Sequence, residues 1–498
     1  MRIGIDIGGT FTDFVIFDET TGQFTTYKTL STPQAPEQAV LNGLKTLINN
    51  DQLSNNDAEL RIVHGSTVAT NALLERKGAV TALVATDGFK DVLEIARQNR
   101  PDIYDFFSRR PASLVPPHLC FEVEERVDHH GNPLQVLDPA TLDSLVEQLQ
   151  AAKVTSVAVS LLFSFLYPDH EQMVADRLRE EGFSVSLSSE VLPEFREFER
   201  TSTTVVSAYV SPVMDRYLER LEAQSGADDF RVMQSNGGSI RAEQARREAG
   251  RCVLSGPAGG VVGAKYVAEA AGFNHLLTFD MGGTSTDVSL YAGQMEITTE
   301  SEIGGLPIRL PVIDIHTVGS GGGSIAYVDP GGALRVGPQS AGADPGPICY
   351  GQGGQQPTVT DANVILGRLA ADQFLGGEMQ LDVSAAETAL ANLAEQAGLS
   401  AQPELTLAQT AALGVIAVVN AHMERALRVI SIQRGHDPRE FTLVSFGGAG
   451  SLHAVDLARS LSIPRVLIPP SAATLSAFGR GLRPKRKMPF PQNKPTSA

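Results

Sequence analysis

The sequence of 498 residues contains no tryptophan and only three cysteines. Without tryptophan, a carbohydrate-binding platform would have to be built from its Phe and Tyr side chains. Cys120, Cys252 and Cys349 are far apart, odd in number and without Cys-x-x-Cys spacing. This pattern disfavours a disulfide framework and a zinc site, and it is typical of a protein from a reducing cytosol.

Long hydrophobic runs are also missing. No apolar run approaches the ~20 residues that a membrane helix needs. No signal peptide is visible either, because the first predicted strand begins almost at Met1. We therefore expect a cytoplasmic protein without a membrane partner.

Positive charge is scarce, since 40 Lys and Arg residues face 57 Asp and Glu residues, a net charge of −17. Nucleic-acid backbones require a basic surface, so a nucleic-acid partner is disfavoured. The Gly-x4-Gly-Lys-Ser/Thr pattern is absent, which disfavours a Walker-type ATPase. The length predicts two or three domains.

What the chain does contain is one phrase written twice. Residues 5–13 read IDIGGTFTD and residues 279–287 read FDMGGTSTD, with six of nine positions identical. In both, an apolar run leads into the phrase and a largely apolar run follows it, which predicts a β-hairpin with a tight Gly-Gly turn. Glycines let a backbone approach an anion, and hydroxyl and N–H groups can hold phosphate oxygens. Two such hairpins predict that one polyphosphate is bound from two sides.

The carboxylates of the repeated phrase are candidates for holding a divalent metal or orienting a water. Their alternative role is turn capping, which short acids perform well. We interpret the carboxylates as a set that organises a metal and water, with Asp6 and Asp280 as the metal ligands. The candidate catalytic residues are Asp6, Asp13 and Asp280, and the candidate cofactor-binding residues of the hairpins are Gly8, Gly9, Thr10, Thr12, Gly282, Gly283, Thr284, Thr286 and Asp287.

A third glycine turn, FGGAGS at 446–451, lies between an apolar strand and a helical stretch. Alone it is a weak signal, because such turns between strand and helix are common. After two phosphate-binding hairpins, however, Gly447, Gly448 and Gly450 are interpreted as completing a nucleotide site.

Strands alternate with helices along the chain, which places it in the α/β class. Residues 97–135 have little periodicity and are predicted to be an insertion, and 201–221 is a long helical stretch interrupted by Pro212. The glycine-dense segment 304–357 is interpreted as active-site loops. His64, His316 and His453 are interpreted as structural histidines rather than catalysts.

The chain resembles the A subunits of ATP-dependent hydantoinases, with the related 5-oxoprolinases and acetone carboxylase subunits. The order of the matching segments makes the resemblance specific, and together they run over nearly the whole chain. They are 5–13, 64–79, 87–105, 255–264, 279–289, 314–326, 341–354, 359–369 and 446–454.

The resemblance implies an actin-like ATPase fold, as in sugar kinases and heat-shock chaperone ATPases, whose two lobes close over ATP and Mg²⁺ or another divalent metal. It implies that ATP drives the opening of a cyclic amide or imide of the hydantoin or 5-oxoproline type, through phosphorylation of the carbonyl. It further implies a B-type partner subunit and homo-oligomerisation. The resemblance leaves open which acid is a general base.

The resemblance also divides the chain into a first ATPase lobe over 1–200 and a second over 201–479. Family members continue for about another domain beyond this point, whereas residues 480–498 are basic and proline-rich. We expect these residues to form a disordered tail in a truncated product that lacks the usual C-terminal domain.

Three alternatives stay open at this point. An acetone-carboxylase-like subunit would carboxylate a carbonyl substrate in an ATP-dependent reaction, and a sugar or acyl kinase would release a stable phosphorylated product. An actin-like assembly protein without enzymatic activity is the third alternative, but no polymerising surface is indicated by the sequence.

Overall fold

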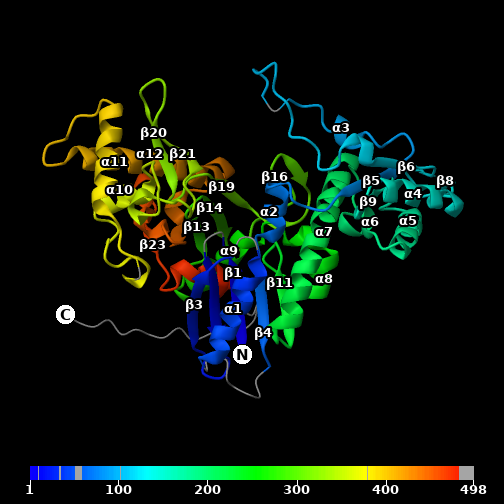
Figure 1. Cartoon of the computed structure of the whole chain (residues 1–498), viewed down its shortest axis with the longest axis horizontal. Coiled ribbons are helices and arrows are strands. Elements are labelled where there is room, and N and C mark those ends of the chain that lie inside the picture. The colour runs from blue at the N-terminus through cyan, green and yellow to red at the C-terminus, as the bar shows by residue number, and fades with distance from the viewer. Residues whose placement is uncertain (9–10, 33–34, 51–58, 101, 378, 482–498) are drawn as a thin grey trace. The chain divides into compact units, whose positions relative to one another are not determined.

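The computed structural model describes residues 1–8, 11–32, 35–50, 59–100, 102–377 and 379–481 (Figure 1). The chain divides into two compact units, each of which is described by itself. The first comprises Met1–Glu19, Tyr27–Ala258 and Ile297–Ile313, and the second comprises Thr20–Thr26, Gly259–Glu296 and the chain from Asp314 onward.

A mixed sheet of six strands, in the order β12-β11-β4-β1-β2-β3, forms the centre of the first unit. β1 and β2 form an antiparallel hairpin, while β4 runs parallel to β1 and β11 parallel to β4. β1 lies inside the sheet and is buried at every position except the partly exposed Asp6, and its three isoleucines alternate with Arg2, Gly4 and Asp6. The strands are β1 Arg2–Ile7, β2 Phe11–Phe17, β3 Phe24–Leu30, β4 Arg61–Gly65, β11 Asp229–Met233 and β12 Ser239–Arg241.

The second unit has a sheet of five strands, in the order β19-β14-β13-β22-β23. Its path repeats that of the first unit: a hairpin, a third strand beside the second, a fourth parallel to the first, and a fifth parallel to the fourth. This repetition shows an internal duplication that extends well beyond the repeated phrase. The strands are β13 His275–Met281, β14 Thr286–Ala292, β19 Ile315–Val318, β22 Thr442–Phe446 and β23 Arg465–Leu467.

A second, parallel sheet is inserted into the first unit between α2 (Val68–Leu74) and α7 (Glu197–Ser225). Its order is β10-β9-β5-β6, and helices α4, α5 and α6 accompany it (Figure 1). The predicted insertion at 97–135 lies inside this larger segment. The elements are β5 Thr81–Thr86, α3 Val92–Ile95, β6 Cys120–Val123, α4 Leu142–Ala151, β9 Ser156–Ser160, α5 Asp169–Glu180, β10 Ser184–Leu187 and α6 Ser188–Val191.

Helix α7 continues without a break through Pro212, where the sequence had predicted an interruption. Proline has no N–H to donate to the carbonyl four residues earlier, that of Ala208. The Ser156 hydroxyl of β9 donates to this carbonyl at 2.7 Å, and the Ala79 N–H donates to the next one, Tyr209, at 3.0 Å. Residues of the inserted segment thus donate hydrogen bonds to the two α7 carbonyls near Pro212, including the one for which proline has no N–H.

Helices of the second unit pack around one apolar cluster that includes Phe279, Val288, Val415 and Leu443. Glycines on α9 allow α14 to approach closely: a Cβ on Gly263 would lie 2.6 Å from the Leu475 carbonyl oxygen. The helices of this unit are α9 Ser255–Ala270 (from Gly259 onward), α10 Val359–Ile365, α11 Val383–Gln396, α12 Leu407–Ile430, α13 Ala454–Ser460 and α14 Leu475–Gly481.

Short elements complete the two units. In the described part of the chain, no helix combines the length and the apolar character required to cross a membrane. The remaining helices are α1 Pro36–Asn49 and α8 Ala242–Arg247, and the remaining strands form the pairs β7 Arg126–Val127 with β8 Pro133–Gln135, β15 Ile297–Thr298 with β18 Val312–Ile313, β16 Ser301–Ile303 with β17 Leu306–Ile308, and β20 Ser324–Val328 with β21 Leu334–Ser340.

Candidate functional site

The first copy of the repeated phrase forms the hairpin that its sequence predicts. Asp6 on β1 lies opposite Asp13 on β2, and the Gly8 N–H donates to the Phe11 carbonyl at 2.9 Å, closing the turn. The predicted ligands Gly9 and Thr10 lie outside the described residues. The first turn therefore brings the two acids of its strands to directly opposed positions.

The second copy repeats this geometry. Asp280 on β13 lies opposite Asp287 on β14, and the Gly282 N–H donates to the Ser285 carbonyl at 3.0 Å. Gly283 and Thr284 at the tip are exposed. A Cβ on Gly283 would meet no atom within 4 Å, so this turn presents bare backbone to open space.

The buried threonines of the phrase support the turns. The Thr12 hydroxyl lies 3.0 Å from that of Ser31, which donates to the Gly8 carbonyl at 2.8 Å. In the second unit the Thr286 hydroxyl donates to the Ser320 carbonyl at 2.5 Å. Both threonine side chains are fully buried, so in this structure they hold the segment beside each turn. Their direct binding of a cofactor stays a prediction.

A glycine loop, residues 319–324, packs directly on the second turn. The Gly322 and Gly323 N–H groups donate to the carbonyls of Gly282 and Gly283 at 3.0 and 2.7 Å. A Cβ on Gly321 would lie 2.6 Å from backbone atoms of Gly283 and Thr284, so glycine is required here for the close approach. This loop is part of the glycine-dense segment 304–357, whose assignment to the active site stays a prediction.

The third glycine turn lies beside the second hairpin. Gly447 has a φ of +80°, and a Cβ on it would overlap Asp280 Oδ1 and lie 2.5 Å from the Met281 carbonyl oxygen. The Ala449 N–H donates to the same Met281 carbonyl at 3.0 Å. Gly448 is exposed with no atom near its Cβ position, whereas Gly450 is buried against Ser445. The second unit thus joins one carboxylate, Asp280, to two bare glycine turns.

The first unit has a counterpart to this third turn that the sequence reasoning missed. β4 runs parallel to β1 with Gly65 level with Asp6, just as Phe446 of β22 is level with Asp280. Residues 65–68, Gly-Ser-Thr-Val, therefore occupy the place of residues 446–449. A strand ending in small polar residues was the available signal, but the long insertion after α2 separates it from the next strand of the repeat.

The opposed acids differ in their neighbours. Lys28 Nζ lies 3.0 Å from Asp13 Oδ1, and it also lies 4.8 Å from the centre of the Phe11 ring. Asp287 instead accepts a hydrogen bond from the Thr317 hydroxyl at 2.5 Å. Burial raises the pKa of Asp287 above its ordinary value, and the Thr317 hydroxyl opposes this shift. The charge of Asp13 is compensated by a cation, whereas Asp287 has a hydroxyl at the equivalent place.

Mg²⁺ could be held here only with help from a ligand. Among the described residues no group of three or more His, Cys, Asp and Glu side chains is arranged to hold a metal ion. Mg²⁺ in proteins is commonly held by one or two carboxylates plus phosphate oxygens and waters. Asp280 beside two open glycine turns fits that arrangement, because phosphates in the free space would supply the missing oxygens.

Comparison with protein-family models shows to which family the chain belongs. A family model described as hydantoinase/oxoprolinase matches residues 200–484, and the model of the hydantoinase/oxoprolinase N-terminal region matches residues 2–182. The chain belongs to the hydantoinase/oxoprolinase family. The resemblance drawn from the ordered motifs is thereby confirmed.

Two relatives of this hydantoinase/oxoprolinase family member align with nearly the whole of its chain. It is 40% identical to the caprolactamase subunit alpha of Pseudomonas jessenii, covering 96% of this chain and 70% of that protein. It is 38% identical to the 5-oxoprolinase of Saccharomyces cerevisiae, covering 96% of this chain and 40% of that protein.

Solved structures of the family confirm the expected α/β, actin-like fold class. The ATP-dependent caprolactamase from Pseudomonas jessenii matches with a TM-score of 0.85 at 40% identity, over 96% of this chain and 70% of that one. Acetone carboxylase matches with a TM-score of 0.80 at 31% identity, over 97% and 70%.

Two of the three histidines highlighted from the sequence are buried and hydrogen-bonded, as expected of structural residues. His64 Nε2 lies 2.6 Å from the Tyr217 hydroxyl, and His453 Nδ1 lies 2.7 Å from Asn420 Oδ1. Burial lowers the pKa of His453 to about 4, so this ring is neutral at physiological pH. His316 lies on β19, paired with Val288 of β14.

Proposed function

We propose that this chain is the ATP-using subunit of an enzyme that opens a cyclic amide or imide of the hydantoin or 5-oxoproline type. The observation that carries the proposal is the duplicated hairpin, in which the same opposed acids and the same closed Gly turn occur once in each unit. Relatives whose names are caprolactamase and 5-oxoprolinase support the class of substrate.

In this proposal the glycine turns bind phosphate groups of ATP through backbone N–H groups, and Asp6 and Asp280 hold Mg²⁺. The metal would neutralise charge that develops on the transferred phosphoryl group. Asp287 and Asp13 flank these acids across each hairpin. Asp13 is a proposed catalytic residue from the sequence, and Lys28 forms an ion pair with its carboxylate.

The proposed reaction begins when the amide oxygen of the ring attacks the γ-phosphorus, which forms a carbon–oxygen–phosphorus link and releases ADP. Water then adds to the carbon, and the carbon–nitrogen bond breaks as the nitrogen takes up a proton. A second water releases phosphate from the resulting acyl phosphate and leaves a free carboxylate. ATP and two waters are consumed for each ring opened.

A second subunit of B type is part of the proposal, together with self-association of this chain. Two relatives carry subunit names, caprolactamase subunit alpha and the acetophenone carboxylase gamma subunit of Aromatoleum aromaticum. We propose that the partner contributes to the hydrolytic steps, while the chain described above supplies the phosphoryl transfer.

Carboxylation of a carbonyl compound is the second candidate, because the acetone carboxylase structure matches over nearly the whole chain. The two reactions differ in what they consume. Hydrolysis needs only ATP and water, whereas carboxylation needs bicarbonate and leaves a new carbon–carbon bond.

The test is a screen of ADP release with hydantoin, 5-oxoproline, caprolactam and acetone, with and without bicarbonate and a co-expressed B-type subunit. Ring opening, measured by mass spectrometry of the amino acid product, should rise in parallel with ADP when a cyclic amide is present. Turnover that requires bicarbonate and a ketone would instead support the carboxylase. A stable phosphorylated product would contradict both.

A further inference from the structure

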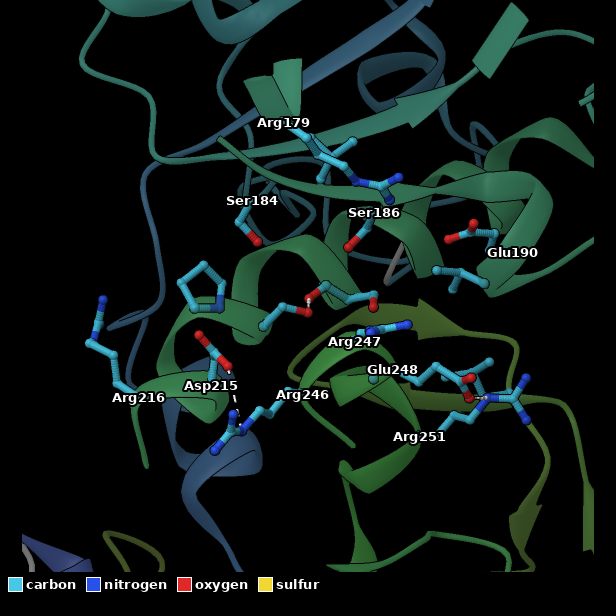
Figure 2. A pocket seen from close by; sticks show the side chains of 17 residues that line it. Arg179, Ser184, Ser186, Glu190, Asp215, Arg216, Arg246, Arg247, Glu248 and Arg251 are labelled. Atoms are coloured by element: carbon cyan, nitrogen blue, oxygen red, sulfur yellow. Dashed lines mark hydrogen bonds and ion pairs between the residues drawn. The ribbon is translucent and has the colours of Figure 1, made fainter. Parts of the chain in front are cut away.

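The first unit contains a cavity of about 800 Å³ that none of the candidate site residues lines (Figure 2). We call it the arginine cavity. Its walls come from the end of α5, strand β10, the middle of α7, and α8 with the turn at 248–251 that follows it. Its volume lies within the range of small-molecule sites, about 300–1,000 Å³. The arginines that line it are Arg179, Arg216, Arg246, Arg247 and Arg251.

Two of these arginines are compensated by acids close to the cavity. Arg251 forms an ion pair with Glu248 at 2.7 Å, and Arg246 lies 2.9 Å from Glu222 and 3.6 Å from Asp215. Figure 2 shows the ion pairs of Arg251 and Arg246 with Glu248 and Asp215. These pairs fix the lower wall of the cavity without adding net charge.

The other three arginines carry charge that the walls do not balance. Among the residues that the structure describes, Arg179 has only Asp176 as an ion-pair partner, at 4.0 Å. Arg247 pairs at 2.9 Å with the exposed Glu243, which lies outside the wall. Arg216 has no ion pair with any residue in the described ranges. Only one uncompensated carboxylate, Glu190, lines the cavity. In a chain with a net charge of −17, this local excess of cations is unusual.

Hydroxyl groups add neutral hydrogen-bonding capacity. Ser184 and Ser186 of β10 and Ser207 and Ser211 of α7 line the same space. Ser207 is 1% exposed, and its Oγ has no hydrogen-bond partner within the described part of the chain. A bound ligand that accepts or donates a hydrogen bond at this hydroxyl would supply the missing partner.

We infer that the arginine cavity binds a small molecule carrying two carboxylate or phosphate groups. One acidic group pairs bidentately with one guanidinium. The three arginines without an acidic partner in the wall come from three different elements, α5, α7 and α8, and Figure 2 shows Arg179 in the upper part of the view with Arg216 and Arg247 lower down. A ligand with two separated acidic groups can pair with two of these arginines at once, each acidic group with its own guanidinium.

The test is calorimetric titration of the full chain, without ATP or Mg²⁺, with citrate, pyrophosphate and acetate at equal ionic strength. Saturable binding of citrate or pyrophosphate, at least about 10-fold tighter than acetate, is expected. Binding of citrate alone would assign carboxylates, and binding of pyrophosphate alone would assign phosphates. Absence of saturable binding of both would overturn the inference.

Variants locate the binding. The double substitution Arg216→Gln with Arg247→Gln should weaken binding at least 10-fold, and Ser207→Val about 3-fold or more. Arg220→Gln is the matched control, because Arg220 also lies on α7 and pairs with Glu37 away from the cavity. Equal affinities in the double variant and the control would contradict the assignment, and unchanged melting temperatures without ligand would show that the variants are folded.

Discussion

Asp280 is the residue on which the proposed chemistry depends most. It is level with Phe446 on the neighbouring strand and lies against Gly447, so it belongs to the hairpin and the glycine turn together. A carboxylate at this place would be one ligand of a divalent metal, and the metal would supply positive charge to bound phosphates.

Substitution of Asp280 by Ala should reduce ATP turnover more than about 100-fold while the fold persists, because the loss falls on charge stabilisation in the transition state. The measurement is steady-state ADP release, with circular dichroism as a check of folding. Asp329→Ala is the control, since Asp329 pairs with Arg335 on an exposed hairpin. Equal turnover in the Asp280 variant and this control would remove the second hairpin from the mechanism.

Gly447 and Gly448 offer a matched pair. Gly447→Ala should destabilise the protein by about 1–3 kcal/mol, because the residue has a positive φ and its Cβ would overlap Asp280. Gly448→Ala should change stability by less than about 0.5 kcal/mol, since its Cβ would meet open space. Thermal unfolding of both variants measures the difference, and equal melting temperatures would show that the tight contact is not required.

Residue-scale contacts were only partly predictable from sequence. The hairpins followed from the sequence pattern, but the sequence did not predict which acids face each other. In the second hairpin Gly283 and Thr284 form the tip, rather than the two glycines, and this register places Asp280 opposite Asp287. The neighbours of the opposed acids did not follow either: Lys28 lies on β3 and Thr317 on β19, and neither strand belongs to the repeated phrase. Which acid carries a compensated charge depends on those strands.

At the scale of single elements, α7 shows how the inserted sheet and the central sheet share one helix. Its residues Val205 and Ala208 pack with the inserted sheet, while Val206 and Val210 pack with the central sheet. The helix is therefore buried along much of its length, which explains why a proline is tolerated only where other groups satisfy the open carbonyls.

Ser156→Ala should lower the melting temperature by about 2–4 °C, because it leaves the Ala208 carbonyl of α7 buried without a donor. Differential scanning fluorimetry measures the shift. Ser144→Ala on the exposed face of α4 is the control and should leave the melting temperature unchanged. A Ser156 variant as stable as the control would mean that Pro212 needs no such support.

The junction of α12 and α13 predicts a dependence of stability on pH. His453 is fully buried, and its pKa is lowered to about 4 from an ordinary value of 6.5. The unfolded chain binds a proton below pH 6.5 that the folded chain accepts only near pH 4, so stability falls as pH falls through this window. The loss from this group amounts to about 3 kcal/mol.

Urea unfolding at pH 7.0 and pH 4.5 should therefore show a smaller acid destabilisation in His453→Gln than in the unaltered chain. Glutamine cannot take up a proton, so the acid-dependent part of the loss disappears even if the variant is less stable throughout. An identical pH dependence in both proteins would show that His453 does not titrate on unfolding.

At the scale of the whole molecule, the duplication of the two sheets extends the repeated phrase into five equivalent strands. The repeated phrase is visible in the sequence, and the α/β class could be predicted from it. The wider repeat of five strands could not. The strands after the hairpins share no visible sequence, because burial specifies only apolar character. The insertion between α2 and α7 also separates the first unit's fourth and fifth strands by more than one hundred and fifty residues. The division of the chain near residue 200 stays a prediction.

Isothermal titration calorimetry with ATP and Mg²⁺ shows whether the duplicated hairpins bind a nucleotide. We expect saturable binding with a Kd in the range of about 1 μM to 1 mM, typical of enzyme substrates. We also expect at least about 10-fold weaker binding in Asp280→Ala and in Gly447→Ala, with Asp329→Ala unchanged. No saturable binding to the folded chain, or equal binding in all three variants, would contradict the assignment of the duplicated hairpins to ATP.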